Sequence, residues 1–387
     1  MSEKSAQADV DTRVRRAFLD QAGYCDRLGS PFTARLCSVL GDGLDGSTEI
    51  ERCILQWPGD ASAFADSVPL RVVGALHYLV RAGRASELAK LYPPHVMPEP
   101  TTLLAAARAV LLGNQSFVRD FLQSPPQTNE VGRAAPLIAG WLEIAARTRQ
   151  PLSLFEIGSS AGLNLIADRY AYRFGEVQWT PELRSRGSSG QLSGPMLTCE
   201  WTGRSPAVHA PLQVQSRRGC DRHPLNTADP TQRERLAAYV WADQTDRLER
   251  LNAAIRTMLS DPVFVESADA ADWIEAVLPS NGEPGITRVV FHSVVWSYLE
   301  GSAQQRIANR LREIGAASST EKPLAWLRFE LVSKDEPATL RLTLWPSGND
   351  ELLARVHPHG TWVRWCNRRY PDENDLRRPG WPNGACR

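Results

Sequence analysis

Apolar residues recur at helical spacing along the first 150 residues of the chain. Val14, Phe18 and Ala22 are four positions apart, and Leu70, Val73, Leu76, His77 and Val80 recur at the three- and four-residue spacing of a helix. Residues 101–112 and 131–146 predict further helices, and clusters of glycine and proline separate the helical stretches. The pattern therefore predicts an all-helical N-terminal domain over residues 1–150.

From residue 151 the pattern changes to short apolar runs that alternate with amphipathic stretches. These runs predict strands at residues 152–157, 212–215, 263–266, 288–291 and 324–332, with helices at 231–258, 272–278 and 304–314. Such alternation is typical of a parallel, doubly wound sheet. Three last runs, at residues 340–345, 352–356 and 361–365, predict antiparallel strands. We therefore expect an α/β domain over residues 151–387.

One stretch of this second half does not fit the alternation. Residues 172–210 are too long for an ordinary connection, and they contain possible short strands at 177–179 and 197–201. The pattern predicts an insertion that lies above the edge of the sheet as a lid.

Composition and charge narrow the class of protein. The chain has 387 residues with 44 basic and 44 acidic side chains, so its net charge does not favour nucleic acid. No signal peptide is visible, and no apolar run approaches the roughly 18 residues of a membrane-spanning helix. The seven cysteines are widely spaced, and His357 and His359 lack a third metal ligand. We expect a cytoplasmic protein that binds no membrane, nucleic acid or metal.

The most informative segment spans residues 156–162, with the sequence EIGSSAG. It follows the strand predicted at 152–157 and precedes a helix predicted at 163–170. Glycine permits backbone angles that a Cβ would block, and a helix start offers free N–H groups. The segment could be an S-adenosylmethionine corner or a nucleophile elbow with Ser160 at its centre. A dinucleotide fingerprint fails at Ser160 and Leu163, where it requires glycine.

Polar residues follow the other predicted strands at the same edge of the sheet. Asp221 comes after the second strand and Asp269 after the third, whereas His292 and Ser293 end the fourth. In such a sheet the ligand binds beyond the carboxyl ends of the strands.

This succession resembles that of the class I S-adenosylmethionine-dependent methyltransferases. The resemblance covers residues 151–365 and implies a Rossmann-like sheet with a parallel core and antiparallel C-terminal strands. It implies that Glu156 organises the glycine turn, that Asp221 holds the ribose hydroxyls and that Asp269 receives the adenine amino group. The remaining cofactor contacts that it implies are Gly158, Ser160, Gly162, Asn164 and Ser293.

His292 then faces the methyl group, and it is the candidate general base for a small-molecule acceptor. From the helical half, Asn129, Glu130 and Arg133 could line the cleft as substrate contacts, or Asn129 and Glu130 could simply cap a helix. The sequence departs from the family pattern at Ser160, which replaces a glycine, and at Asp221, which lies beyond the insertion.

Two other functions remain open. The first is a non-catalytic nucleotide-binding or interaction module of the same fold, and the second is a serine hydrolase that uses Ser160. The hydrolase fold lays down several strands before its elbow, but here the preceding half is predicted to be helical. Structural interpretations also remain: Asp269 as a helix cap, and His292 as a hydrogen-bonded core residue.

Over its whole length the chain also resembles an uncharacterised bacterial family of unknown function. The segments that carry this resemblance are residues 29–31, 127–133, 156–170 and 357–360. It implies a helical half followed by a methyltransferase-like half, and it supplies no activity.

Overall fold

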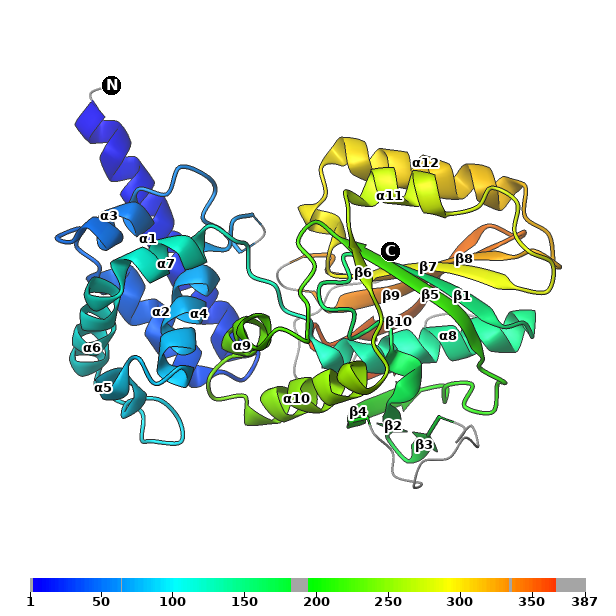
Figure 1. Ribbon diagram of the computed structural model, residues 1–387, viewed down its shortest axis with the longest axis horizontal. Coiled ribbons are helices and arrows are strands. Elements are labelled where there is room, and N and C mark those ends of the chain that lie inside the picture. Colours follow the sequence, from blue (N-terminus) through cyan, green and yellow to red (C-terminus); the bar gives the residue numbers. More distant parts are fainter. Residues whose placement is uncertain (1–2, 64, 182–193, 334–335, 367–387) are drawn as a thin grey trace. The chain divides into compact units, whose positions relative to one another are not determined.

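The computed structural model describes residues 3–63, 65–181, 194–333 and 336–366 (Figure 1). The chain divides by its contacts into two compact units. The first spans Met1–Asn129 and Leu225–Asn252, and the second spans Glu130–Pro224 and Ala253–Arg387. The sequence pattern predicts one boundary near residue 150, whereas this division groups residues 225–252 with the N-terminal helices.

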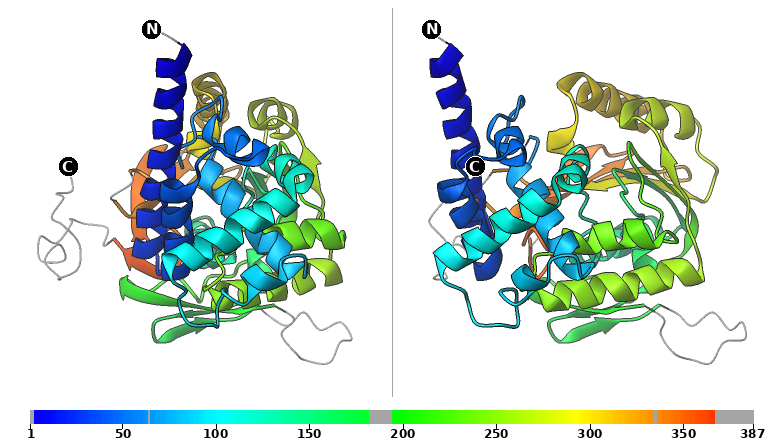
Figure 2. Two further views of the ribbon diagram at one scale, coloured as in Figure 1. Left: turned by 90° about the vertical axis from the view of Figure 1, so that its left-hand side faces the viewer. Right: turned by 60° about the vertical axis from the view of Figure 1, so that its left-hand side comes forward.

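The described residues of the first unit fold into helices. These are α1 (Glu3–Arg27), α2 (Pro31–Gly43), α3 (Glu49–Leu55), α4 (Val68–Arg81), α5 (Ser86–Ala89), α6 (Pro100–Gly113), α7 (Gln115–Leu122), α9 (Pro230–Ala238) and the first half of α10 (Thr245–Ser260). Proline occupies the first turn of α2, α4, α6 and α9, where its missing N–H costs no hydrogen bond. The helix α1 packs along α2 and is drawn in dark blue in Figure 2.

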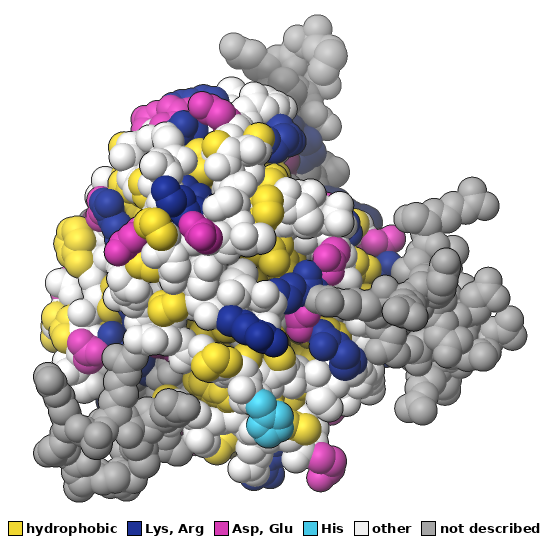
Figure 3. All heavy atoms as spheres, turned by 90° about the vertical axis from the view of Figure 1, so that its right-hand side faces the viewer, with side chains coloured by type: hydrophobic (Ala, Val, Ile, Leu, Met, Phe, Trp, Pro, Cys, Tyr) yellow, Lys and Arg dark blue, Asp and Glu magenta, His cyan; other side chains and the backbone are white. Residues whose placement is uncertain are grey.

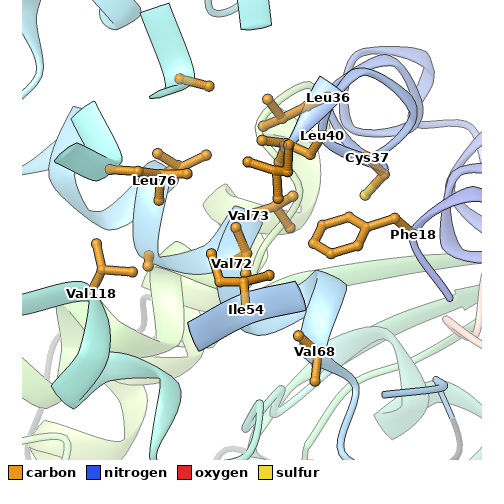
Figure 4. Close-up of a cluster of buried hydrophobic side chains, with 14 of the residues drawn as sticks. Phe18, Leu36, Cys37, Leu40, Ile54, Val68, Val72, Val73, Leu76 and Val118 are labelled. Atoms are coloured by element: carbon orange, nitrogen blue, oxygen red, sulfur yellow. The ribbon is translucent and has the colours of Figure 1, made fainter. Parts of the chain in front are cut away.

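A cluster of buried apolar side chains holds these helices together (Figure 4). Leu36 and Leu40 on α2 and Val72 and Leu76 on α4 are spaced by one helical turn, so each pair presents one face to the cluster. Tyr239, directly after α9, belongs to the same cluster. This burial explains why residues far along the chain join the N-terminal helices.

The long helix predicted at residues 231–258 is two helices, with a break between α9 and α10. The break residue Asp243 accepts hydrogen bonds from the hydroxyl of Ser30 and, at 2.8 Å, from the N–H of Phe32 at the start of α2. Next to it, the Gln244 side chain donates to the carbonyl of Leu28 at 2.8 Å. These tertiary contacts with the α1–α2 turn favour the break over helical continuity.

The second unit is built on a mixed, mostly parallel sheet of eleven described strands. They are β1 (Leu152–Ile157), β2 (Ala171–Phe174), β3 (Val177–Trp179), β4 (Met196–Gly203), β5 (Val214–Asp221), β6 (Val265–Ser267), β7 (Thr287–Ser293), β8 (Leu324–Glu330), β9 (Ala338–Trp345), β10 (Asn349–Val356) and β11 (Trp362–Trp365). Their order is β3-β2-β4-β11-β10-β9-β8-β7-β1-β5-β6. The strands β6, β5, β1, β7 and β8 are parallel, and β9, β10 and β11 follow in antiparallel pairs.

Helices cover both faces of the parallel strands (Figure 1). The helix α8 (Ala134–Thr148) packs on one face, where Trp141 meets Phe291 with ring centroids 5.2 Å apart. On the other face lie α11 (Ala270–Val277) and α12 (Gly301–Ala316). The ring of Trp273 packs edge-on against that of Phe155, with centroids 6.4 Å apart. Successive side chains of a strand point to opposite faces of the sheet. Because helices cover both faces here, nearly all side chains of β1 are buried and most of them are apolar.

The insertion predicted above the sheet edge instead extends the sheet in its own plane. The strand β4 runs parallel to β11 on one side and to β2 on the other, and β3 closes this end. Aromatic packing stabilises the extension. The ring centroid of Trp201 lies 5.3 Å from that of Trp365, on which it stacks, and 5.1 Å from that of Phe174. The rest of the predicted lid, residues 182–193, lies outside the described residues.

Candidate functional site

The order of the strands defines where a ligand site is expected in the second unit. Among the parallel strands, β5 and β6 lie on one side of β1, and β7 and β8, which come later in the chain, lie on the other. The carboxyl ends of β1, β5 and β7 therefore meet where the strand order reverses, which is the usual position of ligand sites in open α/β sheets. The residues predicted after these strands are brought together at this edge.

In the turn after β1, φ is positive at Gly158 (69°) and Gly162 (74°), as the glycines predict, and it is also positive at Ser160 (53°). A Cβ at Gly158 would lie only 2.4 Å from Cγ2 of Val295, so glycine also permits close packing there. For Ser160 this conformation is uncommon and marks a turn that its surroundings hold in place.

The helix predicted at residues 163–170 is not formed. The segment is a series of tight turns that ends in the 3-10 helix η2 (Ala167–Arg169). Two buried tyrosines explain the difference: the Tyr170 hydroxyl donates to the Leu163 carbonyl at 2.7 Å, and the Tyr172 hydroxyl donates to the Ala167 carbonyl at 2.6 Å. The site therefore has no helix N-terminus after β1, and any ligand must be contacted by side chains and turn amides.

Three buried polar atoms of this turn lack a hydrogen-bond partner among the described residues. They are Oε2 of Glu156, Oγ of Ser160 and Oδ1 of Asn164, on side chains that are 1%, 8% and 2% exposed. Buried polar groups are nearly always hydrogen-bonded, so each such atom requires an explanation. Three of them lie within nine residues at the point where the strand order reverses, so this turn is the candidate ligand site.

Glu156 is protonated at neutral pH. Burial raises its pKa to about 8, the nearby charge of Asp221 adds to the rise, and a hydrogen bond from Ser159 opposes it. A protonated carboxyl group can donate a hydrogen bond as well as accept one.

Asp221, the predicted ribose ligand, ties two turns together. One carboxylate oxygen accepts from the N–H of Ser160 at 2.9 Å, and the other accepts from the N–H of His223 at 2.9 Å. It thereby fixes the glycine turn of β1 to the end of β5.

Asp269, the predicted adenine ligand, begins the helix α11. Its Oδ1 accepts from the N–H groups of Ala271 at 2.9 Å and Asp272 at 3.4 Å, and Arg222 lies 3.0 Å from Oδ2. Burial alone would raise its pKa, but the hydrogen bond from Arg222 and the helix N–H groups outweigh burial and lower it. The N-cap interpretation of the sequence is confirmed by these contacts, and the adenine contact stays a prediction.

His292, the predicted general base, is fully buried with both ring nitrogens engaged. The indole N–H of Trp326 donates to Nε2 at 3.1 Å, so the ring proton of the neutral form lies on Nδ1. Nδ1 then donates to Glu330 at 2.6 Å, and the ring stacks on Trp296 at 5.0 Å. In this arrangement neither nitrogen is left for a ligand. The role of His292 as a base stays a prediction that would require the Trp326 contact to open.

Glu330 is a residue of this edge that the sequence analysis missed. It ends β8, and its Oε1 accepts from the N–H groups of Val295 at 3.2 Å and Trp296 at 3.3 Å in addition to His292. The only signal in the sequence was an acidic residue in the apolar run predicted at residues 324–332, because its partners lie 34–38 positions away.

The predicted substrate contacts have structural partners. Glu130 caps the 3-10 helix η1 (Val131–Arg133) by accepting from the N–H of Gly132 at 2.9 Å. Arg133 donates to the carbonyls of Ser293 at 3.3 Å and Pro358 at 3.0 Å, so it links the turn after β7 to the turn at residues 357–360. Ser293 thus contributes its carbonyl to the scaffold. Asn129 is buried and belongs to the first unit.

The other ionisable groups indicate no metal centre in the part of the chain that the structure describes, where no group of three histidine, cysteine or acidic residues could hold an ion. The ring of His357 accepts from the N–H of His359 at 3.1 Å within its own turn. Among the described helices, none combines the length and the apolar character that crossing a bilayer requires.

The family described as "Uncharacterized protein conserved in bacteria (DUF2332)" matches residues 15–365. The chain belongs to this family. The match covers both units, including the glycine turn, the residues after β5, β6 and β7 and the turn at residues 357–360. No curated protein and no solved structure matches the chain.

Proposed function

We propose that this protein binds S-adenosylmethionine at the carboxyl edge of β1, β5 and β6 and transfers its methyl group to a small-molecule acceptor. The observation that carries the proposal is the trio of buried, unpartnered polar atoms of Glu156, Ser160 and Asn164 after the first strand. The parallel order β6-β5-β1-β7-β8 with an antiparallel neighbour at β9 supports a Rossmann-like methyltransferase sheet.

The donors and acceptors of the turn fit a nucleoside with an amino-acid tail. Protonated Glu156 and the Ser160 hydroxyl can donate, whereas Asn164 Oδ1 can only accept. Oδ2 of Asp269 accepts one bond, from Arg222, so it can accept another from an amino group. Gly158 and Gly162 would let the backbone approach the ligand, since their positive φ angles fix the turn without a side chain.

The bound cofactor would supply an electrophilic methyl group on a sulfonium centre. The task of this chain is then to position an acceptor in line with that methyl group and to exclude water, and positioning alone can lower a barrier by several kcal/mol. We assign no proton transfer to His292 in the arrangement described, because both of its nitrogens are hydrogen-bonded.

A small acceptor fits the charge distribution better than nucleic acid. Basic and acidic side chains are interspersed on the face shown in Figure 3. The arginines that line the groove along the first half of β5 are each paired with a carboxylate: Arg169 with Asp261, Arg217 with Asp168 and Arg218 with Glu266. A cytoplasmic location remains our expectation from the sequence.

Isothermal titration of the full chain with S-adenosylhomocysteine tests the proposal. We expect saturable binding, and we expect Asn164→Ala to weaken it by about tenfold, since one buried hydrogen bond is worth about 1–1.5 kcal/mol. Glu313→Gln, an exposed change on α12, is the matched control that should bind like the wild type. Wild-type protein that gives no binding heat with millimolar ligand would refute the proposal.

The two alternatives give different outcomes in the same set of experiments. Binding without turnover on any acceptor indicates a non-catalytic module. Labelling of Ser160 by a fluorophosphonate indicates a hydrolase. We do not adopt the hydrolase, because the Ser160 hydroxyl has no base within hydrogen-bond distance in the part of the chain that is described.

A further inference from the structure

The turn after β7 holds a conformation that its sequence does not favour. Val294 has φ of 53°, in the left-handed region that β-branched residues avoid. Such conformations persist only where the surrounding structure fixes them, and they cluster at functional sites. What fixes this turn is therefore informative about its use.

Besides the Phe329 carbonyl, which accepts from the N–H of Val294 at 2.8 Å, the carboxylate of Glu330 holds the residues on both sides of Val294. One oxygen of Glu330, Oε1, accepts three hydrogen bonds. Two come from the N–H groups of Val295 and Trp296, which follow Val294, and the third comes from Nδ1 of His292, which precedes it. Trp326 orients the His292 ring through its own N–H, so the proton on Nδ1 faces Glu330. The strained residue is thus bracketed on both sides by bonds to one oxygen atom.

The same turn packs against the glycine turn of the candidate site. The Val295 side chain packs over Gly158, so closely that a Cβ there would lie 2.4 Å away. Gly158 belongs to the turn that carries the unpartnered atoms of Ser160 and Asn164. A shift of the turn after β7 would therefore move the Val295 side chain that packs on the glycine turn.

We propose that Glu330 is a positioning residue, which holds the strained turn after β7 in the shape that the nucleoside site requires. The inference rests on the proposed function. Glu330 needs no contact with the ligand for this role, because it acts through Val295 and Trp296. In this arrangement the buried His292 donates the third hydrogen bond to Oε1 of Glu330.

A double-mutant cycle between Glu330 and Val294 tests the inference in the full chain. Glu330→Ala removes the acceptor, and we expect it to weaken S-adenosylhomocysteine binding about tenfold, whereas Glu330→Gln keeps a carbonyl acceptor and should lose less. Adding Val294→Gly removes the strain, because glycine adopts positive φ freely. The double variant should therefore bind at least about threefold more tightly than Glu330→Ala alone. Glu313→Ala is the control.

Hydrogen exchange of the Val295 and Trp296 amides without ligand separates this inference from the proposed function. We expect exchange to speed up about tenfold in Glu330→Ala and to slow again in the double variant. Unchanged exchange, or faster exchange with unchanged ligand affinity, would overturn the positioning role. If the wild type binds no nucleoside, the proposed function fails, and the exchange data alone decide whether Glu330 holds the turn.

Discussion

Replacement of Glu156 by glutamine should change how the stability of the second unit depends on pH. The pKa of Glu156 is about 8 in the folded protein, against an ordinary value of 4.5. Below pH 4.5 both the folded and the unfolded chain carry the proton, and between pH 4.5 and 8 only the folded chain keeps it. The stability that this proton provides is therefore lost as the pH rises towards 8.

The size of the effect follows from the same shift. About 3.5 pKa units correspond to about 5 kcal/mol, or about 1.4 kcal/mol for each pH unit in that window. Glutamine has the same shape and does not titrate. We therefore subtract the free energy of unfolding of Glu156→Gln from that of the wild type. This difference should fall by about 5 kcal/mol between pH 4.5 and 8.

Urea unfolding of both proteins at pH 5, 6, 7 and 8 measures this difference, with Glu313→Gln as an exposed control that should follow the wild type. Carbon-13 NMR of the Glu156 carboxyl group gives its pKa directly. Parallel stability profiles for wild type and Glu156→Gln, together with a carboxyl group that titrates near 4.5, would refute the reasoning.

Three other substitutions test the packing of the glycine turn and the burial of His77. Gly158→Ala should cost about 2–5 kcal/mol in urea unfolding, because it adds both a clash with Val295 and strain at positive φ. Gly29→Ala, at φ of 78° with open space around it, should cost only about 1–2 kcal/mol, and equal costs would contradict the clash. In the first unit, burial, together with the nearby charge of Arg81, lowers the pKa of His77 to about 4. Stability should therefore fall by up to about 3 kcal/mol from pH 6.5 to 4, a loss that His77→Gln should abolish in the same assay.

The periodic elements were predictable because their patterns are local. The apolar run at residues 152–157 is β1 with the same bounds, and the strands predicted further along the chain all formed with shifts of a few residues. The failures have tertiary causes. The hydroxyls of Tyr170 and Tyr172 favour turns where a helix was predicted, and Asp243 breaks the helix predicted at residues 231–258. No local pattern contains these contacts.

The sequence predicted where the candidate residues lie in the fold rather than which contacts they make. The sequence indicated Glu156, Ser160 and Asn164 through the small-residue turn, and these are the side chains with unpartnered buried atoms. It could not show that His292 has both nitrogens occupied, or that Glu330 is its partner, because those contacts depend on how β7 and β8 pair. The sequence identifies which residues follow the strands. Only the three-dimensional contacts distinguish a residue that could bind a ligand from one that holds the fold in place.

The return of residues 225–252 to the N-terminal helices has a consequence for the gene. Each unit is encoded in two separate stretches, so no single cut between them releases either one whole. A fragment that starts at residue 151 would carry Tyr239 without the apolar partners that bury it. We therefore expect that removal of either unit by a single truncation would also remove part of the other unit.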